Sequence, residues 1–179
     1  TFFVGSLLFT SAATMQFLMS RAELPEQELA SEHRWSRRSR PRTTDWTASA
    51  VQLVGTLEFN VTTLRAALLV AGTGAATGQQ VWRPDAIGSV LFLVSSAIAL
   101  APEVRRRRHD HVRGRSWTIA ALNMLGSVFF GLSAIGAWTV PSTGALLSLP
   151  LANGGTVLGA VCFLAGALLL LPRRYPGRS

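Results

Sequence analysis

Long apolar stretches with few or no charges alternate in this chain with short segments that hold most of its charged residues. An apolar stretch of about 18 or more residues predicts a membrane-spanning helix, because a bilayer core about 30 Å thick requires roughly 20 residues at 1.5 Å each. Five spans are expected, at residues 2–19, 47–70, 86–101, 117–140 and 151–171. The third is short and is expected to extend outward through Trp82. The sequence therefore predicts an all-α integral membrane protein with five transmembrane helices.

The net charge of +8 comes from 17 basic residues, all of them arginine. In a soluble protein such a charge would indicate nucleic-acid binding. Here nearly all the arginines fall in residues 21–45, in residues 102–116 or after Leu171, and short basic loops stay in the cytoplasm. We therefore expect a multi-pass protein of a bacterial cytoplasmic membrane with a cytoplasmic C-terminus, and no nucleic-acid partner.

The basic loop after the third span carries four consecutive arginines, followed by a His-Asp-His sequence. Arginines near a membrane surface attract anionic headgroups at about 1 kcal/mol each, so lipids are the expected partner of this loop. A metal site formed by His109, His111 and His33 is a weaker alternative to solvated histidines, and no metal or other cofactor is expected. The expected lipid-headgroup residues are Arg105, Arg106, Arg107 and Arg108.

Each predicted span contains the pattern Gly-small-x-x-Phe, with two further small residues seven and eight positions after the glycine. On a helix these positions share one stripe about 120° wide, and small residues there let neighbouring helices approach closely. We expect the stripes to serve packing rather than ligand binding. The expected packing residues are Gly5, Phe9, Gly55, Phe59, Gly88, Phe92, Gly126, Phe130, Gly159 and Phe163.

The spacing of these patterns predicts a larger repeat. The glycines of the second and third spans are 33 residues apart, as are those of the fourth and fifth. This spacing defines a two-helix hairpin that starts and ends in the cytoplasm, with parallel copies at 46–102 and 117–172. The loops 21–45 and 103–116 and the tail 173–179 are then cytoplasmic. Residues 1–20 correspond to the second half of an earlier hairpin, so we expect a further helix upstream of Thr1.

Two segments of the second hairpin, NMLGSVFF at 123–130 and GAVCFL at 159–164, resemble the YrhK-like domain family. This family is a small two-helix membrane module of bacterial proteins, and the resemblance covers both hairpins, about 110 residues. It implies a membrane fold without assigned chemistry. The glycine and phenylalanine positions carry over as packing positions only, so no catalytic or cofactor-binding residue is expected.

Glu58 is the one acidic residue near the middle of a predicted span, where a charge costs at least about 2.5 kcal/mol. It is either a protonatable group in a water-filled pathway or a carboxyl that ties its helix to another helix or subunit. Phe129 holds the equivalent position in the second hairpin, which weighs against a symmetric pathway. The possible polar neighbours of Glu58 are Arg65, Gln52, Asn60 and Asn123.

Two functions are thus compatible with the sequence. The first is a structural membrane protein or accessory subunit that packs through its small-residue stripes, against itself or other membrane subunits, and has no chemistry of its own. The alternative is a small transporter or channel that uses Glu58. An enzyme is not expected, because the chain has no phosphate-binding loop, no nucleophile with a paired base, and no histidine within a predicted span.

Overall fold

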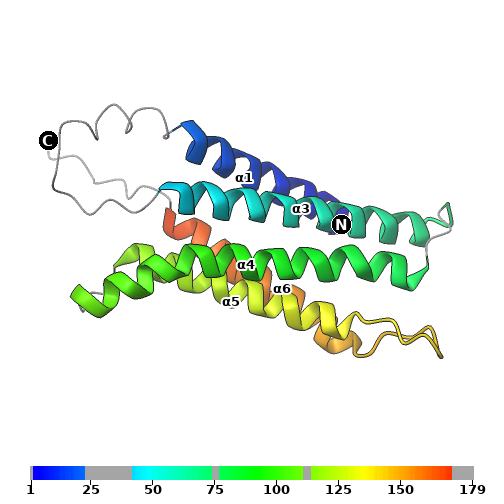
Figure 1. Ribbon diagram of the computed structural model, residues 1–179. Coiled ribbons are helices and arrows are strands. Elements are labelled where there is room, and N and C mark those ends of the chain that lie inside the picture. Colours follow the sequence, from blue (N-terminus) through cyan, green and yellow to red (C-terminus); the bar gives the residue numbers. More distant parts are fainter. Residues whose placement is uncertain (1, 23–41, 74–76, 111–113, 171–179) are drawn as a thin grey trace, which may run out of the picture.

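The computed structural model describes residues 2–22, 42–73, 77–110 and 114–170, which form an antiparallel helical bundle (Figure 1). All five helices are long and apolar enough to cross a membrane by length and composition, and the described residues contain no β-strand. The prediction of five helices of membrane-spanning length is therefore confirmed. The helices are α1 (Phe2–Ala22), α3 (Arg42–Val70), α4 (Gly78–Asp110), α5 (Arg115–Gly136) and α6 (Leu149–Leu170).

Each helix packs against its neighbours in the sequence, in the order α1, α3, α4, α5, α6. Consecutive helices run in opposite directions, so α1, α4 and α6 share one direction and α3 and α5 the other (Figure 1). The C-terminal ends of α1 and α4 and the N-terminal ends of α3 and α5 lie at the same end of the bundle. Arg21, Arg42, Arg105 and Arg115 therefore lie toward one end of the structure.

Helix α4 is much longer than the predicted third span at both ends, and it continues through Pro84 and Pro102. A proline within a helix removes one backbone hydrogen bond, to the carbonyl four residues earlier. For Pro84 that carbonyl belongs to Gln80, and it accepts a 2.7 Å hydrogen bond from Arg65 Nη1 of α3. Part of the predicted loop 103–116 is thus helical, and so are the two ends of the predicted loop 21–45.

Helix α5 ends at Gly136, four residues before the predicted boundary. The chain then forms a tight turn in which Val140 N–H donates to the Ala145 carbonyl and Gly144 adopts a φ of 68°. The side chains of Trp82 and Trp138 meet edge to face beside this turn, with ring centroids 4.3 Å apart.

Candidate functional site

A cluster of five phenylalanines, one from each helix, occupies the centre of the bundle. Three are buried and two are partly buried. Ring centroids of contacting pairs are between 5.3 and 5.9 Å apart, within the range of favourable aromatic pairs. The rings therefore fill the centre of the bundle at this level. The cluster consists of Phe9, Phe59, Phe92, Phe130 and Phe163.

The rings divide according to the direction of their helices. Phe9, Phe92 and Phe163, from the three helices that run together, form a nearly equilateral triangle with sides of 5.6, 5.5 and 5.9 Å. Phe59 and Phe130, from the two helices that run the other way, lie 5.4 Å apart. The first set is thus a triangle of three rings, and the second is a single pair.

Glycines bring α3 and α4 together beside this cluster. A Cβ atom on Gly88 would lie 3.0 Å from the Gly55 carbonyl oxygen and 2.8 Å from the Phe59 ring. A Cβ atom on Gly55 would lie 3.3 Å from the Gly88 carbonyl oxygen. Neither position has room for a side chain without movement of a neighbour. Both glycines therefore allow the close approach of α3 and α4.

The same contacts occur between α5 and α6. A Cβ atom on Gly159 would lie 3.0 Å from the Gly126 carbonyl oxygen, and one on Gly126 would lie 2.9 Å from the Phe163 ring. Gly5 of α1 differs, because no heavy atom lies within 4 Å of its Cβ position. Four of the five predicted packing glycines thus face another helix, and Gly5 does not.

Two other glycines approach a neighbouring backbone even more closely. A Cβ on Gly155 would lie 2.7 Å from the Phe129 carbonyl oxygen, and one on Gly136 would lie 2.6 Å from the Ala152 nitrogen. The Gly-small-x-x-Phe pattern does not include either residue. Gly155 and Gly159 do form a Gly-x-x-x-Gly pair, which is a known signal of close helix packing in membranes.

Serine hydroxyls connect α4 and α5 on both sides of the cluster. Ser89 donates to the Phe130 carbonyl at 3.2 Å, and Ser127 is placed to donate to the Phe92 carbonyl at 3.1 Å. The hydroxyl oxygens of Ser96 and Ser127 lie 2.7 Å apart. All three serines are buried, so their polar groups are satisfied within the protein.

Hydroxyls also connect the helices within each pair. Ser95 of α4 donates to the Ala48 carbonyl of α3 at 2.7 Å. Ser133 of α5 donates to the Ala152 carbonyl of α6 at 2.6 Å, and its oxygen lies 2.7 Å from the Thr156 hydroxyl. These hydrogen bonds fix the axial register of the two helices in each closely packed pair.

Helix α1 is joined to α3 by side-chain hydrogen bonds. The hydroxyls of Ser6 and Thr63 are 2.8 Å apart, and Asn60 Nδ2 donates to Thr10 Oγ1 at 2.9 Å. The carbonyl oxygen of the same amide, Asn60 Oδ1, is buried and has no hydrogen-bond partner. Asn60 therefore acts as a polar link between helices, with one acceptor left unsatisfied.

The predicted polar group around Glu58 does not form one site. Glu58 is half-buried and makes no hydrogen bond or ion pair with any described residue. Arg65 bonds to Gln80, and Asn60 bonds across to α1. Half-buried Gln52 lies on α3, while the Asn123 side chain lies on α5 beside Gly166 of α6.

Sequence reasoning missed one buried acidic group. Glu103, near the cytoplasmic end predicted for α4, is 3% exposed and accepts a 2.9 Å hydrogen bond from the Ser116 hydroxyl of α5. In the sequence Glu103 falls in the predicted cytoplasmic loop 103–116. The helical continuation past Pro102 is what brings this carboxylate against α5.

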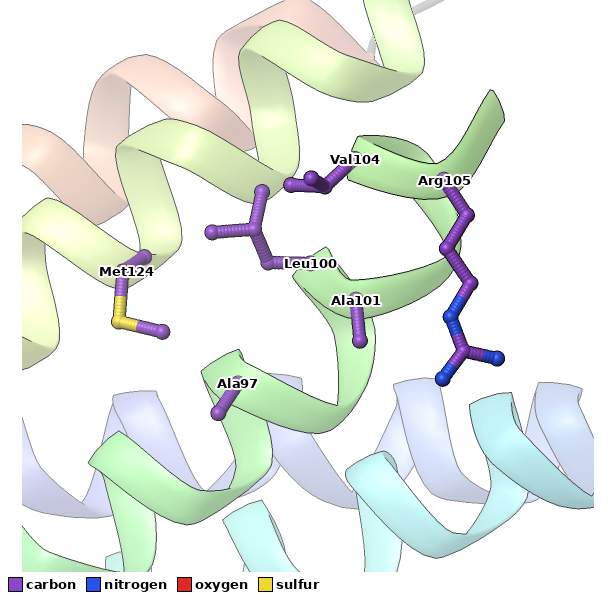
Figure 2. A pocket seen from close by; sticks show the side chains of 6 residues that line it. All are labelled: Ala97, Leu100, Ala101, Val104, Arg105 and Met124. Carbon is purple, nitrogen blue, oxygen red and sulfur yellow. The ribbon is translucent and has the colours of Figure 1, made fainter. Parts of the chain in front are cut away.

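An open hollow of about 370 Å³ lies between α4 and α5, near the C-terminal end of α4 (Figure 2). Figure 2 shows Leu100 and Val104 directed toward the side of Met124, with Arg105 at the edge. An apolar hollow beside one guanidinium group is suited to a hydrocarbon chain with an anionic headgroup. Its lining consists of Ala97, Leu100, Ala101, Val104, Arg105 and Met124.

The other predicted headgroup and metal positions lie outside what the structure describes. Residues 106–110 belong to α4, but their side chains are not among the described parts, and residues 33 and 111 fall outside the described ranges. Within the described residues, no group of three or more His, Cys, Asp or Glu side chains is placed to hold a metal ion.

Comparison of the chain with protein families, with characterised proteins and with solved structures gave no match. The resemblance to the YrhK-like domain family therefore stays a prediction.

Proposed function

We propose that this chain is a multi-pass protein of a bacterial cytoplasmic membrane, of the structural or accessory-subunit type, without chemistry of its own. Its basic segments and its C-terminus face the cytoplasm in this proposal. The five apolar helices support this topology, as does the placement of Arg21, Arg42, Arg105 and Arg115 at one end of the bundle, against Arg65 and Arg83 at the other. Its partners would be anionic lipids, and other membrane subunits or further copies of itself.

The observation that carries the proposal is the phenylalanine cluster. A transport pathway along the bundle axis requires a polar or hydrated passage, whereas five aromatic rings lie in contact there. The buried hydroxyls around the rings bond to carbonyls of neighbouring helices rather than facing a cavity. These features are those of a packed core.

We further propose that the helices form tandem parallel hairpins, α3 with α4 and α5 with α6. The support is that the equivalent glycines meet in both pairs, Gly55 with Gly88 and Gly126 with Gly159. A duplicated packing unit fits a protein whose role is assembly. It does not by itself indicate a substrate.

Purified protein reconstituted into vesicles tests the absence of a pathway. A pH-sensitive dye and an ion-sensitive dye inside the vesicles would report leakage, with empty vesicles as the baseline. We expect wild-type protein and the Glu58→Gln variant to leave both signals at the baseline. A protein-dependent flux of protons or ions would overturn the structural proposal.

A transporter or channel remains a second candidate, on one observation. Glu58 is an ionisable group in the middle of α3 without a hydrogen bond or ion pair to a described residue. Such a residue in a membrane is a functional candidate by default. A flux that Glu58→Gln abolishes, with the thermal stability of the wild type retained, would favour this candidate. Loss of folding in the same variant would instead indicate a packing role.

A further inference from the structure

One face of α1 is exposed although the equivalent faces of α4 and α6 are buried. The face consists of Gly5 and, seven residues later, Ala12. The equivalent residues of α4, Gly88 and Ser95, are buried against α3. In both α4 and α6, this face packs on the helix that directly precedes it in the chain.

The residues of α6 show the same relation. The equivalent pair on α6, Gly159 and Gly166, is buried, and both residues face α5. A Cβ on Gly166 would lie 3.0 Å from the Asn123 side-chain oxygen of α5. The exposed face of α1 is therefore the one that receives the preceding helix in each of the two complete pairs.

A second face, on α6, is exposed although its equivalents are covered. Ala160 and Ala167 are exposed, whereas the equivalent residues of α4, Ser89 and Ser96, are 2% and 5% exposed. Both serines of α4 bond to α5, the next helix in the bundle. In α1 the equivalent Ser6 bonds to α3.

The phenylalanine cluster shows that the helices carrying the two exposed faces, α1 and α6, are neighbours in the bundle. Phe9 of α1 and Phe163 of α6 are in contact, with centroids 5.5 Å apart, so these two helices adjoin at the bundle axis. The set with Phe9, Phe92 and Phe163 has three rings, and the set with Phe59 and Phe130 has two. A third ring from a helix between α1 and α6 would make the second set equal to the first.

We propose that a sixth membrane-spanning helix, the one directly preceding α1 in the natural chain, packs between α1 and α6. This inference rests on the membrane location proposed above. The helix would run antiparallel to α1 and α6, and a short connection would join it to α1. It carries a small residue opposite Gly5 and, four residues later, a phenylalanine beside Phe59 and Phe130.

A second copy of this chain fits the two faces less well. The helix between α1 and α6 must run opposite to both to continue the alternation of the bundle. The helices at the edges of a second copy are again α1 and α6. When both copies are inserted in one membrane with the same topology, these helices run parallel to α1 and α6 of the first copy, whereas an antiparallel helix is required. Its helices of the right direction, α3 and α5, are already packed on both sides.

The natural reading frame gives the first check, since it must encode an apolar segment of about 20 residues directly before Thr1. A frame without such a segment would overturn the proposal. Spin labels on the full natural chain in lipid bilayers then test the packing. Leu7 and Val161 provide matched controls, because the equivalent position is exposed on all three helices, at 44%, 57% and 56% for Leu7, Val90 and Val161.

Labels at Ala160 and Ala167 of the full chain are expected to be several-fold less accessible to dissolved oxygen than a label at Val161. In the chain that begins at Thr1, all three should be similar. If the three labels are equally accessible to oxygen in the full chain, the proposal is overturned. It is also overturned if the label at Ala160 becomes protected in the shorter chain as the protein concentration rises, because a second copy would then cover this face. If the control labels at Leu7 and Val161 are accessible to a water-soluble relaxation agent and not to oxygen, these positions do not face lipid, and the proposed membrane location is rejected.

Substitution without a label gives a second measurement in case the label itself disturbs packing. Gly5→Leu is expected to lower the unfolding midpoint of the full chain, because its Cβ would meet the preceding helix. The same change should not lower the unfolding midpoint of the chain that begins at Thr1, because no heavy atom lies within 4 Å of that position and leucine is a better helix former than glycine. Val4→Leu, at a position 60% exposed, is the control. Equal stability of wild-type and Gly5→Leu full chains would count against the sixth helix.

Discussion

Two adjacent glycines of α6 allow a sharp test of how closely α5 and α6 approach. A Cβ on Gly155 would lie 2.7 Å from the Phe129 carbonyl oxygen and 2.8 Å from the Ser133 nitrogen, both of them backbone atoms. A Cβ on Gly154 would meet no heavy atom within 4 Å. Both changes to alanine give the helix the same gain in propensity, about 1 kcal/mol, so their difference isolates the contact.

The magnitude follows from what must move. Ordinary contact begins at 3.4 Å, so α5 and α6 would have to separate by roughly 0.7 Å at Gly155. Overpacking of this kind costs about 1–3 kcal/mol. The shift also strains the two hydrogen bonds of Ser133, each worth about 0.6 kcal/mol in a membrane protein. We therefore expect Gly155→Ala to be about 2–4 kcal/mol less stable than Gly154→Ala.

The assay is equilibrium unfolding in mixed micelles, with increasing fractions of a denaturing detergent and helix content followed by circular dichroism. A difference of about 2–4 kcal/mol corresponds to a change of roughly 30- to 1,000-fold in the unfolding equilibrium constant. If the two variants unfold at the same detergent fraction, the close approach of α5 and α6 at Gly155 is refuted.

Three other substitutions test separate contacts by the same assay. Phe92→Ala should destabilise by about 3–5 kcal/mol because Phe92 is 1% exposed and contacts four other rings, whereas Val94→Ala, at a position 43% exposed, should change stability by less than about 0.5 kcal/mol. Arg65→Met should cost about 0.5–1.5 kcal/mol and Arg65→Lys less, because methionine cannot donate to the Gln80 carbonyl in this exposed hydrogen bond; equal losses would contradict this. Ser95→Ala should cost about 0.6–1.7 kcal/mol, and no loss would contradict a role for its buried hydrogen bond.

The apolar stretches were sufficient to predict the number and order of the helices, because length and charge decide what can cross a bilayer. The ends of the helices were predicted less well. Proline marks a common helix boundary in sequence, yet α4 continues through Pro84, and Arg65 donates to the Gln80 carbonyl that the proline leaves without its helical partner. That compensation comes from a different helix, so local sequence does not show it.

The candidate polar site shows a different limit of sequence reasoning. Glu58 and Arg65 are seven residues apart and project from nearly the same side of α3, which suggested a shared environment. In the structure Arg65 reaches the start of α4, while Asn60 faces α1. Which neighbour a side chain meets depends on the order of the helices around the bundle. The spacing of residues along one helix does not contain that order.

The phenylalanine cluster has a mechanical consequence for a protein in a bilayer. Phe92 contacts rings from all four other helices, so sliding α4 by one residue, about 1.5 Å, would disturb four contacts at once. Individual helices therefore cannot adjust their depth independently when the bilayer is thinner or thicker than the bundle. The response to such a mismatch is instead a tilt of the whole bundle, or a local deformation of the lipid around it.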